Sequence, residues 1–242
     1  MSASPRLAGR LALVTGATRG IGRAVALAYA REGAHLVLVG RTGGALEEVD
    51  DEIRAQGGSA TLVTLDLKLQ EKVDALGPTI YQRWGKLDIL VGNAGILGPL
   101  SPLGHVSAHA WNDVIAVNLT TNWRLIRTLD PLLRRSDAGR AVFVTSGVAS
   151  APRAYWGPYA VSKAGLEALV RVYAQEVEST PVRVNLVNPG PTRTEMRAKA
   201  FPGENPALLK PPEHVCETFV RLAEPACTDN GRLFDLKTGE VR

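Results

Sequence analysis

The stretch Thr15-Gly16-Ala17-Thr18-Arg19-Gly20-Ile21-Gly22 decides the fold, because three glycines stand where a strand turns into a helix. An apolar run, Leu11–Thr15, precedes the stretch, and a helical segment, Ile21–Glu32, follows it and stops at Gly33. Glycines permit a tight turn and close approach to a pyrophosphate, and the helix N-terminus adds free N–H groups. The spacing is G-x-x-x-G-x-G rather than the usual G-x-G-x-x-G. We predict a phosphate-binding turn, with a ligand-free glycine-rich turn as the alternative.

The alternation of strand and helix continues along the whole chain. Strands are predicted at 11–15, 35–39, 60–65, 87–91, 141–145, 182–187 and 232–235. Helices are predicted at 21–32, 45–55, 70–84, 107–135 in one or two pieces, 159–178 and 213–223, with a proline-rich loop at 189–212. Nearly all-apolar strands alternating with helices indicate a parallel sheet covered on both faces. We therefore predict an α/β fold, a three-layer doubly wound parallel sheet of the Rossmann-like type with about seven strands.

Length and composition exclude several classes of protein. The 242 residues are 45% hydrophobic and lack repeats, which favours one domain spanning 1–242. No apolar run reaches the roughly 18 residues that span a bilayer, and the N-terminus lacks a signal-like apolar segment. Two cysteines, Cys216 and Cys227, are too few for a disulfide framework. We expect a cytoplasmic protein with no membrane partner.

The positive net charge of +4 does not indicate a nucleic-acid partner. The 28 lysines and arginines are spread among 24 acidic residues, and no basic block stands out. The four histidines show no metal-ligand spacing, so we expect no metal. The charge fits an ordinary surface or a small anionic ligand.

Polar residues follow the second, third and fourth strands, at the edge where such folds bind ligands. After the second strand stands Arg41, where an NAD site would carry an acid for the ribose 2′-hydroxyl. Arg41 and Arg19 could together clamp a 2′-phosphate, which favours NADP(H) over NAD(H); the alternative is that both are solvated. Asp66-Leu67 could accept a bond from an adenine or cap a helix, and Asn93-Ala94-Gly95 would let backbone approach a ribose.

Three side chains around the fifth strand point to acid–base chemistry. Ser146 ends that strand, and Tyr159 and Lys163 lie one helical turn apart, so they share a face. A tyrosine is a poor acid–base near neutral pH, but an adjacent ammonium group favours its anion and lowers its pKa. Ser146 could hold a substrate oxygen in the same network. The alternative is a core tyrosine beside a surface lysine.

Together these pieces resemble the short-chain dehydrogenase/reductase family in its compact single-domain branch. The resemblance covers about 7–235 and rests on TGATRGIG at 15–22, DL at 66–67, NAG at 93–95, Asn118, Ser146, YAVSK at 159–163 and NPGPTRT at 188–194. The segments SDAG, NPG-TRT-MRA and AFP after residue 135 look most like a bacterial oxidoreductase subgroup whose substrate is undefined.

The resemblance implies a role for each residue. Tyr159 would be the general acid–base, Ser146 would polarise a carbonyl, Lys163 would bind the nicotinamide ribose and lower the tyrosine pKa, and Asn118 would help hold a water. The remaining cofactor-binding residues would be Gly16, Thr18, Arg19, Gly20, Ile21, Gly22, Arg41, Asp66, Leu67, Asn93, Ala94, Gly95, Pro189, Thr192 and Thr194.

The implied activity is hydride transfer between NADP(H) and a carbonyl or alcohol substrate. We expect the substrate to contact Ser146, Trp156 and Met196, with the loop 189–212 and the residues near 95–103 completing its pocket. The family resemblance also implies a homodimer or homotetramer paired through the helices at 107–135 and 159–178. The alternative function is a catalytically silent dinucleotide-binding protein that acts as a redox sensor or scaffold.

Overall fold

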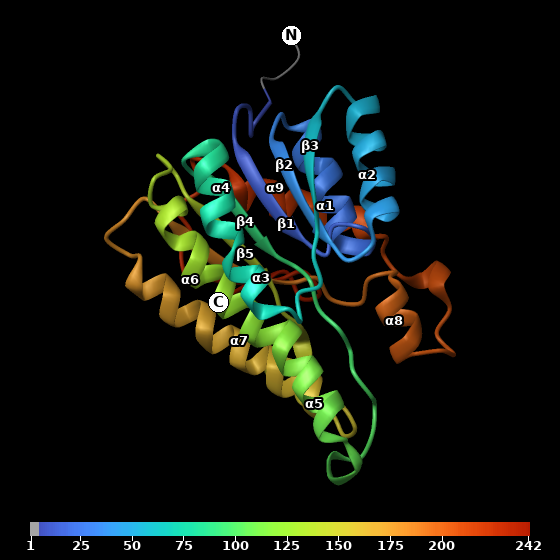
Figure 1. Cartoon of the computed structure of the whole chain (residues 1–242). Coiled ribbons are helices and arrows are strands. Elements are labelled where there is room, and N and C mark those ends of the chain that lie inside the picture. The colour runs from blue at the N-terminus through green and yellow to red at the C-terminus, as the bar shows by residue number, and fades with distance from the viewer. Residues whose placement is uncertain (1–4) are drawn as a thin grey trace.

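The structure, a computed structural model, describes residues 5–242. Eight strands form one sheet in the order β3-β2-β1-β4-β5-β6-β7-β8 (Figure 1). Their bounds are β1 Leu11–Thr15, β2 His35–Gly40, β3 Ser59–Thr64, β4 Ile89–Gly92, β5 Arg140–Val144, β6 Arg183–Asn188, β7 Leu233–Asp235 and β8 Glu240–Val241. The first seven strands are parallel, and the predicted doubly wound sheet is confirmed. The strand order reverses at β1 and β4, the place where such sheets bind ligands.

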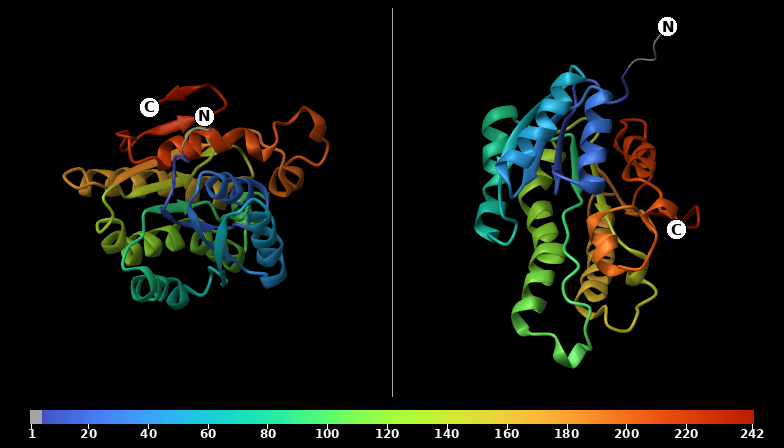
Figure 2. Two further views of the ribbon diagram at one scale, coloured as in Figure 1. Left: turned by 90° about the horizontal axis from the view of Figure 1, so that it is seen from above. Right: turned by 90° about the vertical axis from the view of Figure 1, so that its right-hand side faces the viewer.

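Helices cover both faces of the sheet (Figure 2). One face carries α1 Gly20–Arg31, α2 Gly43–Ala55 and α9 Cys216–Ala223, and the other carries α3 Gln70–Asp74, α4 Leu76–Trp84, α6 Thr121–Leu133 and α7 Gly157–Glu176. Alternate residues of β2 serve the two layers: Leu36 and Leu38 pack with the first set, Val37 and Val39 with the second. A strand buried on both faces needs apolar side chains in both directions, which explains the continuous apolar runs.

The remaining strand, β8, was not predicted. It pairs antiparallel with β7, with Phe234 opposite Val241 and Asp235 opposite Glu240. Both of its residues are exposed, so it lacks the apolar signature of the other strands. Its main-chain bonds to the β7 edge hold it in place: the Leu233 N–H donates to the Arg242 carbonyl at 2.7 Å.

The helix predicted over 70–84 is two helices, α3 and α4, which meet at Ala75. Pro78 explains the break, because it has no N–H to bond the Asp74 carbonyl and its ring crowds that oxygen. Gly77 packs closely on α6: a Cβ there would lie 2.3 Å from the Thr128 carbonyl oxygen. The break therefore lets the chain follow the surface of α6.

The region predicted as helical over 107–135 is α5 Ala108–Ile115, a π-helical turn Ala116–Thr120 and α6. The segments α5 and α8 Glu195–Ala200 lie beyond the carboxyl ends of the strands, with α8 off to one side (Figure 1). Within the part of the chain that the structure describes, no helix combines the length and apolarity needed to cross a bilayer.

Candidate active site

The glycine loop after β1 is held in a shape that larger residues would not adopt. Gly16 has φ +66°, in the left-handed region, where a side chain is strained. A Cβ on Gly22 would lie 2.2 Å from the Gly16 carbonyl oxygen, so the start of α1 packs directly on the loop. Ile21 packs against the core below. The predicted strand–turn–helix context of this motif is confirmed.

Two polar side chains fasten this loop to β4. The Thr15 hydroxyl donates to the Val91 carbonyl at 3.1 Å and accepts from the N–H groups of Asn93 and Ala94, at 3.0 and 3.1 Å. Asn93 Nδ2 donates to the Thr15 carbonyl at 2.9 Å. The Asn93 amide nitrogen, expected near a ribose, therefore also has a structural task. Thr15 was not singled out from the sequence, although a threonine ending an apolar strand before a glycine turn was the available signal.

Arg19 and Arg41 are both exposed after neighbouring strands, and only one has an ionic partner within residues 5–242. Arg19 forms an ion pair with Glu195 of α8, whereas no ion pair or hydrogen bond holds the Arg41 guanidinium there. The two loops touch, because a Cβ on Gly40 would lie 2.7 Å from the Thr18 methyl group. Thr18 and Gly40 are therefore in contact, and each is followed directly by one of the two arginines, Arg19 and Arg41.

Asp66 does not cap a helix, because α3 begins at Gln70 with Leu69 before it. Its Oδ1 instead accepts the Lys68 N–H at 3.0 Å in a local turn, which leaves Oδ2 for another donor. Leu67 is buried and its carbonyl accepts the Thr121 hydroxyl at 2.9 Å. Asp66 and Leu67 are thus held in a turn by hydrogen bonds, and Asp66 Oδ2 can accept a bond from a ligand.

Tyr159 and Lys163 lie on the first turns of α7, both nearly buried. Lys163 Nζ donates to the Val144 carbonyl at 2.7 Å and lies 5.8 Å from the centre of the Tyr159 ring. The bond to β5 anchors α7 at the strand that Ser146 follows. The sequence prediction that these three side chains gather at one strand end is consistent with this geometry.

Burial sets the protonation of this group. It raises the pKa of Tyr159 to about 12, and a hydrogen bond from Ser146 opposes the rise. It also lowers the pKa of Lys163 to about 8, because the charged ammonium is poorly solvated. The lowered tyrosine pKa expected from the sequence is therefore not found, because burial raises the pKa of Tyr159, and the Lys163 ammonium donates to the Val144 carbonyl.

Asn118, in the π-helical turn, ties the chain after β4 to α7. Its side chain is fully buried; Oδ1 accepts the Ile96 N–H at 2.8 Å and Nδ2 donates to the Ile96 carbonyl at 2.9 Å and to Ser162 at 3.0 Å. A Cβ on Gly95 would lie 3.7 Å from Lys163 Nζ. The Asn118 side chain thus positions the backbone at Ile96, and the Asn118 main-chain carbonyl accepts a buried hydrogen bond from Asn122 Nδ2 at 2.8 Å.

An apolar wall surrounds Tyr159. The Trp156 ring lies edge-on at 6.0 Å between ring centres, and Met196 packs into the same cluster. Both are residues expected from the sequence to contact the substrate. Leu97 and Val148 pack in the same cluster, and the Phe201 ring lies 5.6 Å from that of Trp156. Leu97 and Phe201 fall in the two segments expected to line the pocket, near 95–103 and in 189–212, whereas Val148 was not expected.

The loop 189–212 folds back on itself and on the glycine loop. Thr194 caps α8 by accepting the Arg197 N–H at 3.2 Å, and its methyl group would lie 3.3 Å from a Cβ on Gly20. Thr192 is buried, its hydroxyl within 3.4 Å of the Pro189 carbonyl. Thr194 therefore borders the glycine loop, and Thr192 and Pro189 lie together in the turn that leads to it.

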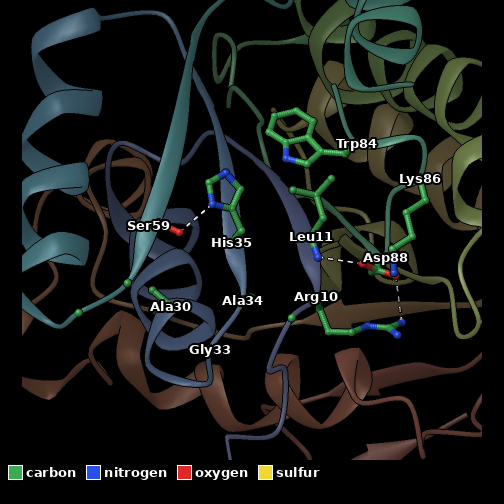
Figure 3. A pocket seen from close by; sticks show the side chains of 13 residues that line it. Arg10, Leu11, Ala30, Gly33, Ala34, His35, Ser59, Trp84, Lys86 and Asp88 are labelled. Atoms are coloured by element: carbon green, nitrogen blue, oxygen red, sulfur yellow. Dashed lines mark hydrogen bonds and ion pairs between the residues drawn. The ribbon is translucent and has the colours of Figure 1, made fainter. Parts of the chain in front are cut away.

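A hollow of about 310 Å³ lies at the opposite, amino end of the sheet (Figure 3). Asp88 is fully buried there; it accepts the Leu11 N–H at 2.9 Å and the Ser136 hydroxyl at 2.6 Å, and pairs with Lys86 at 2.9 Å. His35 bonds Ser59 at 2.7 Å. Most of these polar groups satisfy one another, so we place the candidate active site at the carboxyl end. No group of side chains fit to hold a metal ion occurs within residues 5–242.

Comparisons with known proteins agree with this geometry. A family model of short chain dehydrogenases matches residues 10–205. The oxidoreductase YciK of Escherichia coli (strain K12) is 39% identical over 234 residues, 95% of this chain and 92% of its own.

Two solved structures of short chain dehydrogenases contain a dinucleotide. One, from Shigella flexneri and complexed with NADP, is 38% identical with a TM-score of 0.92, covering 97% of this chain and 99% of its own. Another, from Escherichia coli CFT073 and complexed with NADPH, is 39% identical with a TM-score of 0.91, covering 96% and 98%.

Proposed function

The chain belongs to the short-chain dehydrogenase/reductase family, and we propose that it is an NADP(H)-dependent oxidoreductase that interconverts a carbonyl and an alcohol. The observation that carries the proposal is the placement of Tyr159 and Lys163 beside Ser146, at the strand ends that also hold the glycine loop. The NADP and NADPH found in two similar structures support the choice of cofactor.

The residues present fit such a cofactor. Gly16 and Gly22 let the start of α1 pack directly on the glycine loop, which presents the helix N-terminus to a phosphate. Asp66 keeps one carboxylate oxygen for an adenine amino group. Arg19 and Arg41 offer two cations at adjacent strand ends for a 2′-phosphate. Thr192, Thr194 and Pro189 would border the nicotinamide and phosphates. When bound, NADP(H) supplies or accepts the hydride.

The side chains divide the acid–base work. Ser146 donates a hydrogen bond to the substrate oxygen, and Tyr159 gives its proton to that oxygen as negative charge develops there. A pKa of about 12 keeps Tyr159 protonated at neutral pH, the form that carbonyl reduction requires. Lys163, with a pKa of about 8, is mostly charged at pH 7 and stabilises the phenolate once the proton has left.

Proton resupply and substrate choice follow from the surroundings. The Asn118 carbonyl has a second lone pair beyond its bond to Asn122, which a water linking Lys163 to solvent can use. The wall of Trp156, Met196 and Phe201 favours a substrate with an apolar group beside its carbonyl.

We also propose that residues 1–242 work as one dinucleotide-binding domain with 189–212 as its substrate loop, and that copies pair through α6 and α7 as a homodimer or homotetramer. Exposed apolar side chains on these helices support the pairing: Trp123 on α6, and Val161 and Val172 on α7. A cytoplasmic location is part of the proposal, supported by two cysteines present as free thiols.

The experiment is a panel of aldehydes and ketones with apolar substituents, each assayed with NADPH and with NADH. We expect oxidation of NADPH with at least one class of substrate, slower oxidation of NADH, and neither with Tyr159→Phe. If both dinucleotides bind but no substrate of the panel or of a matching alcohol panel reacts, the catalytically silent alternative replaces the proposal.

A further inference from the structure

An acidic residue of the substrate loop, Glu195, forms an ion pair with Arg19, the arginine that a 2′-phosphate would also bind. Glu195, the first residue of α8, pairs with Arg19 of the glycine loop, 176 positions away in the sequence. Both side chains are substantially exposed, 63% for Arg19 and 47% for Glu195, so the pair is open to exchange. An exposed pair is weakly held and can be displaced by a phosphate that carries more charge and more acceptor oxygens.

We propose that Glu195 is a specificity-determining residue, which competes with the cofactor 2′-phosphate for Arg19 and releases α8 when the phosphate wins. The inference rests on the proposed NADP(H) function. A dinucleotide without that phosphate has no anionic group at this position to bind Arg19, so the ion pair between Arg19 and Glu195 stays intact.

The exchange leaves no charge without a partner. Glu195 also pairs with Lys199 at 2.6 Å, one turn along α8, and keeps this partner when Arg19 leaves. Arg197 makes two bonds of 2.6 Å to Glu204 further along the same loop, independently of Arg19. The helix therefore stays paired and capped while its tether to the glycine loop opens.

The tether connects the phosphate position to the substrate wall. Met196 follows Glu195 directly and packs in the cluster around Tyr159. Phe201 ends α8 and lies against Trp156, which lies against Tyr159. Releasing Glu195 thus frees the segment that carries Met196 and Phe201, two side chains of the apolar wall. Binding of the phosphate would therefore change the mobility of this part of the substrate pocket.

The first test measures dissociation constants of NADPH and NADH for the full chain and for Glu195→Gln. We expect NADPH binding to tighten about two- to fivefold, the range that an exposed ion pair supplies, and NADH binding to stay unchanged. The gain should vanish when Glu195→Gln is combined with Arg19→Met. Glu204→Gln is the matched control, since it removes the same charge from the same loop but faces Arg197.

The second test measures amide hydrogen exchange over 195–201 with adenosine 2′,5′-bisphosphate and with 5′-AMP. The bisphosphate should raise exchange in the full chain and 5′-AMP should not, whereas Glu195→Gln should exchange fast without either. An equal gain for NADPH and NADH, no gain, or unchanged exchange with the bisphosphate would overturn the proposal. If neither dinucleotide bound the unaltered protein, the proposed function itself would fail, which is a separate outcome.

Discussion

The two ends of the sheet make opposite use of buried polar groups. At the amino end, Asp88 has several donors from the chain itself, and the hollow beside it contains side chains that bond one another. At the carboxyl end, Tyr159 and Lys163 are also buried, and poor solvation shifts the pKa values of both toward the neutral forms. Mutually paired polar groups indicate a role in stability at the amino end, and shifted pKa values indicate a functional site at the carboxyl end.

The largest expected effect is on turnover at the carboxyl end. Tyr159→Phe should lower kcat by about a thousandfold, within the range of a lost general acid. The fold has little use for the hydroxyl, so dinucleotide affinity and the urea midpoint should change little. Steady-state kinetics and equilibrium unfolding measure both, and a variant with full turnover would contradict the comparison.

The next effect is on stability at the amino end. Asp88→Ala should lower the free energy of unfolding by about 3–5 kcal/mol, because the Leu11 N–H and the Ser136 hydroxyl lose their acceptor and buried Arg10 loses one of two nearby carboxylates. The kcat of the folded fraction should stay the same. Asp137→Ala is the control: this carboxylate also pairs with Arg10 but is exposed, so its loss should cost under about 1 kcal/mol.

The third effect concerns cofactor choice. Arg41→Asp should reduce the preference for NADPH over NADH about tenfold, since one charge-assisted contact of about 1.4 kcal/mol is lost and repulsion added. Combining it with Arg19→Asp should reduce the preference further. Dissociation constants for both dinucleotides measure the change, and an equal preference before and after would remove the arginines from the site.

The smallest effect is on the pH dependence of stability. The pKa of Lys163 is about 8 in the folded protein and 10.5 as a free side chain, so the unfolded chain binds more protons between these values. Stability therefore rises with pH through this window as the cost of burying the charge disappears. From pH 8 to 9, the unaltered protein should gain up to about 1 kcal/mol relative to Lys163→Met. Parallel unfolding curves at the two pH values measure it.

What could be predicted from the sequence follows the same division. Buried parallel strands are recognisable because they are apolar throughout, and the glycine loop because backbone contact excludes side chains. β8 was missed because a two-residue exposed strand depends on its neighbour, and the break at Ala75 was missed although Pro78 signalled it.

The candidate site was foreseen where a residue is part of a local motif. It was not foreseen where two distant segments meet: Phe201 against Trp156, and Glu195 against Arg19. The protonation of Tyr159 was also misjudged, because spacing along a helix reports a neighbouring charge but not the loss of water around both groups.

The π-helical turn at Ala116–Thr120 bears on how this chain would tolerate a change of length. A wide turn of this kind amounts to one residue inserted into an α-helix. Deleting Leu119 would restore regular α-helical hydrogen bonding from α5 into α6 without loss of helical structure. It would, however, rotate α5 by about 100° relative to α6. Val114 would then leave the core, and the Asn118 amide would leave Ile96. A one-residue deletion here would thus be harmless to secondary structure and damaging to the alignment of the site.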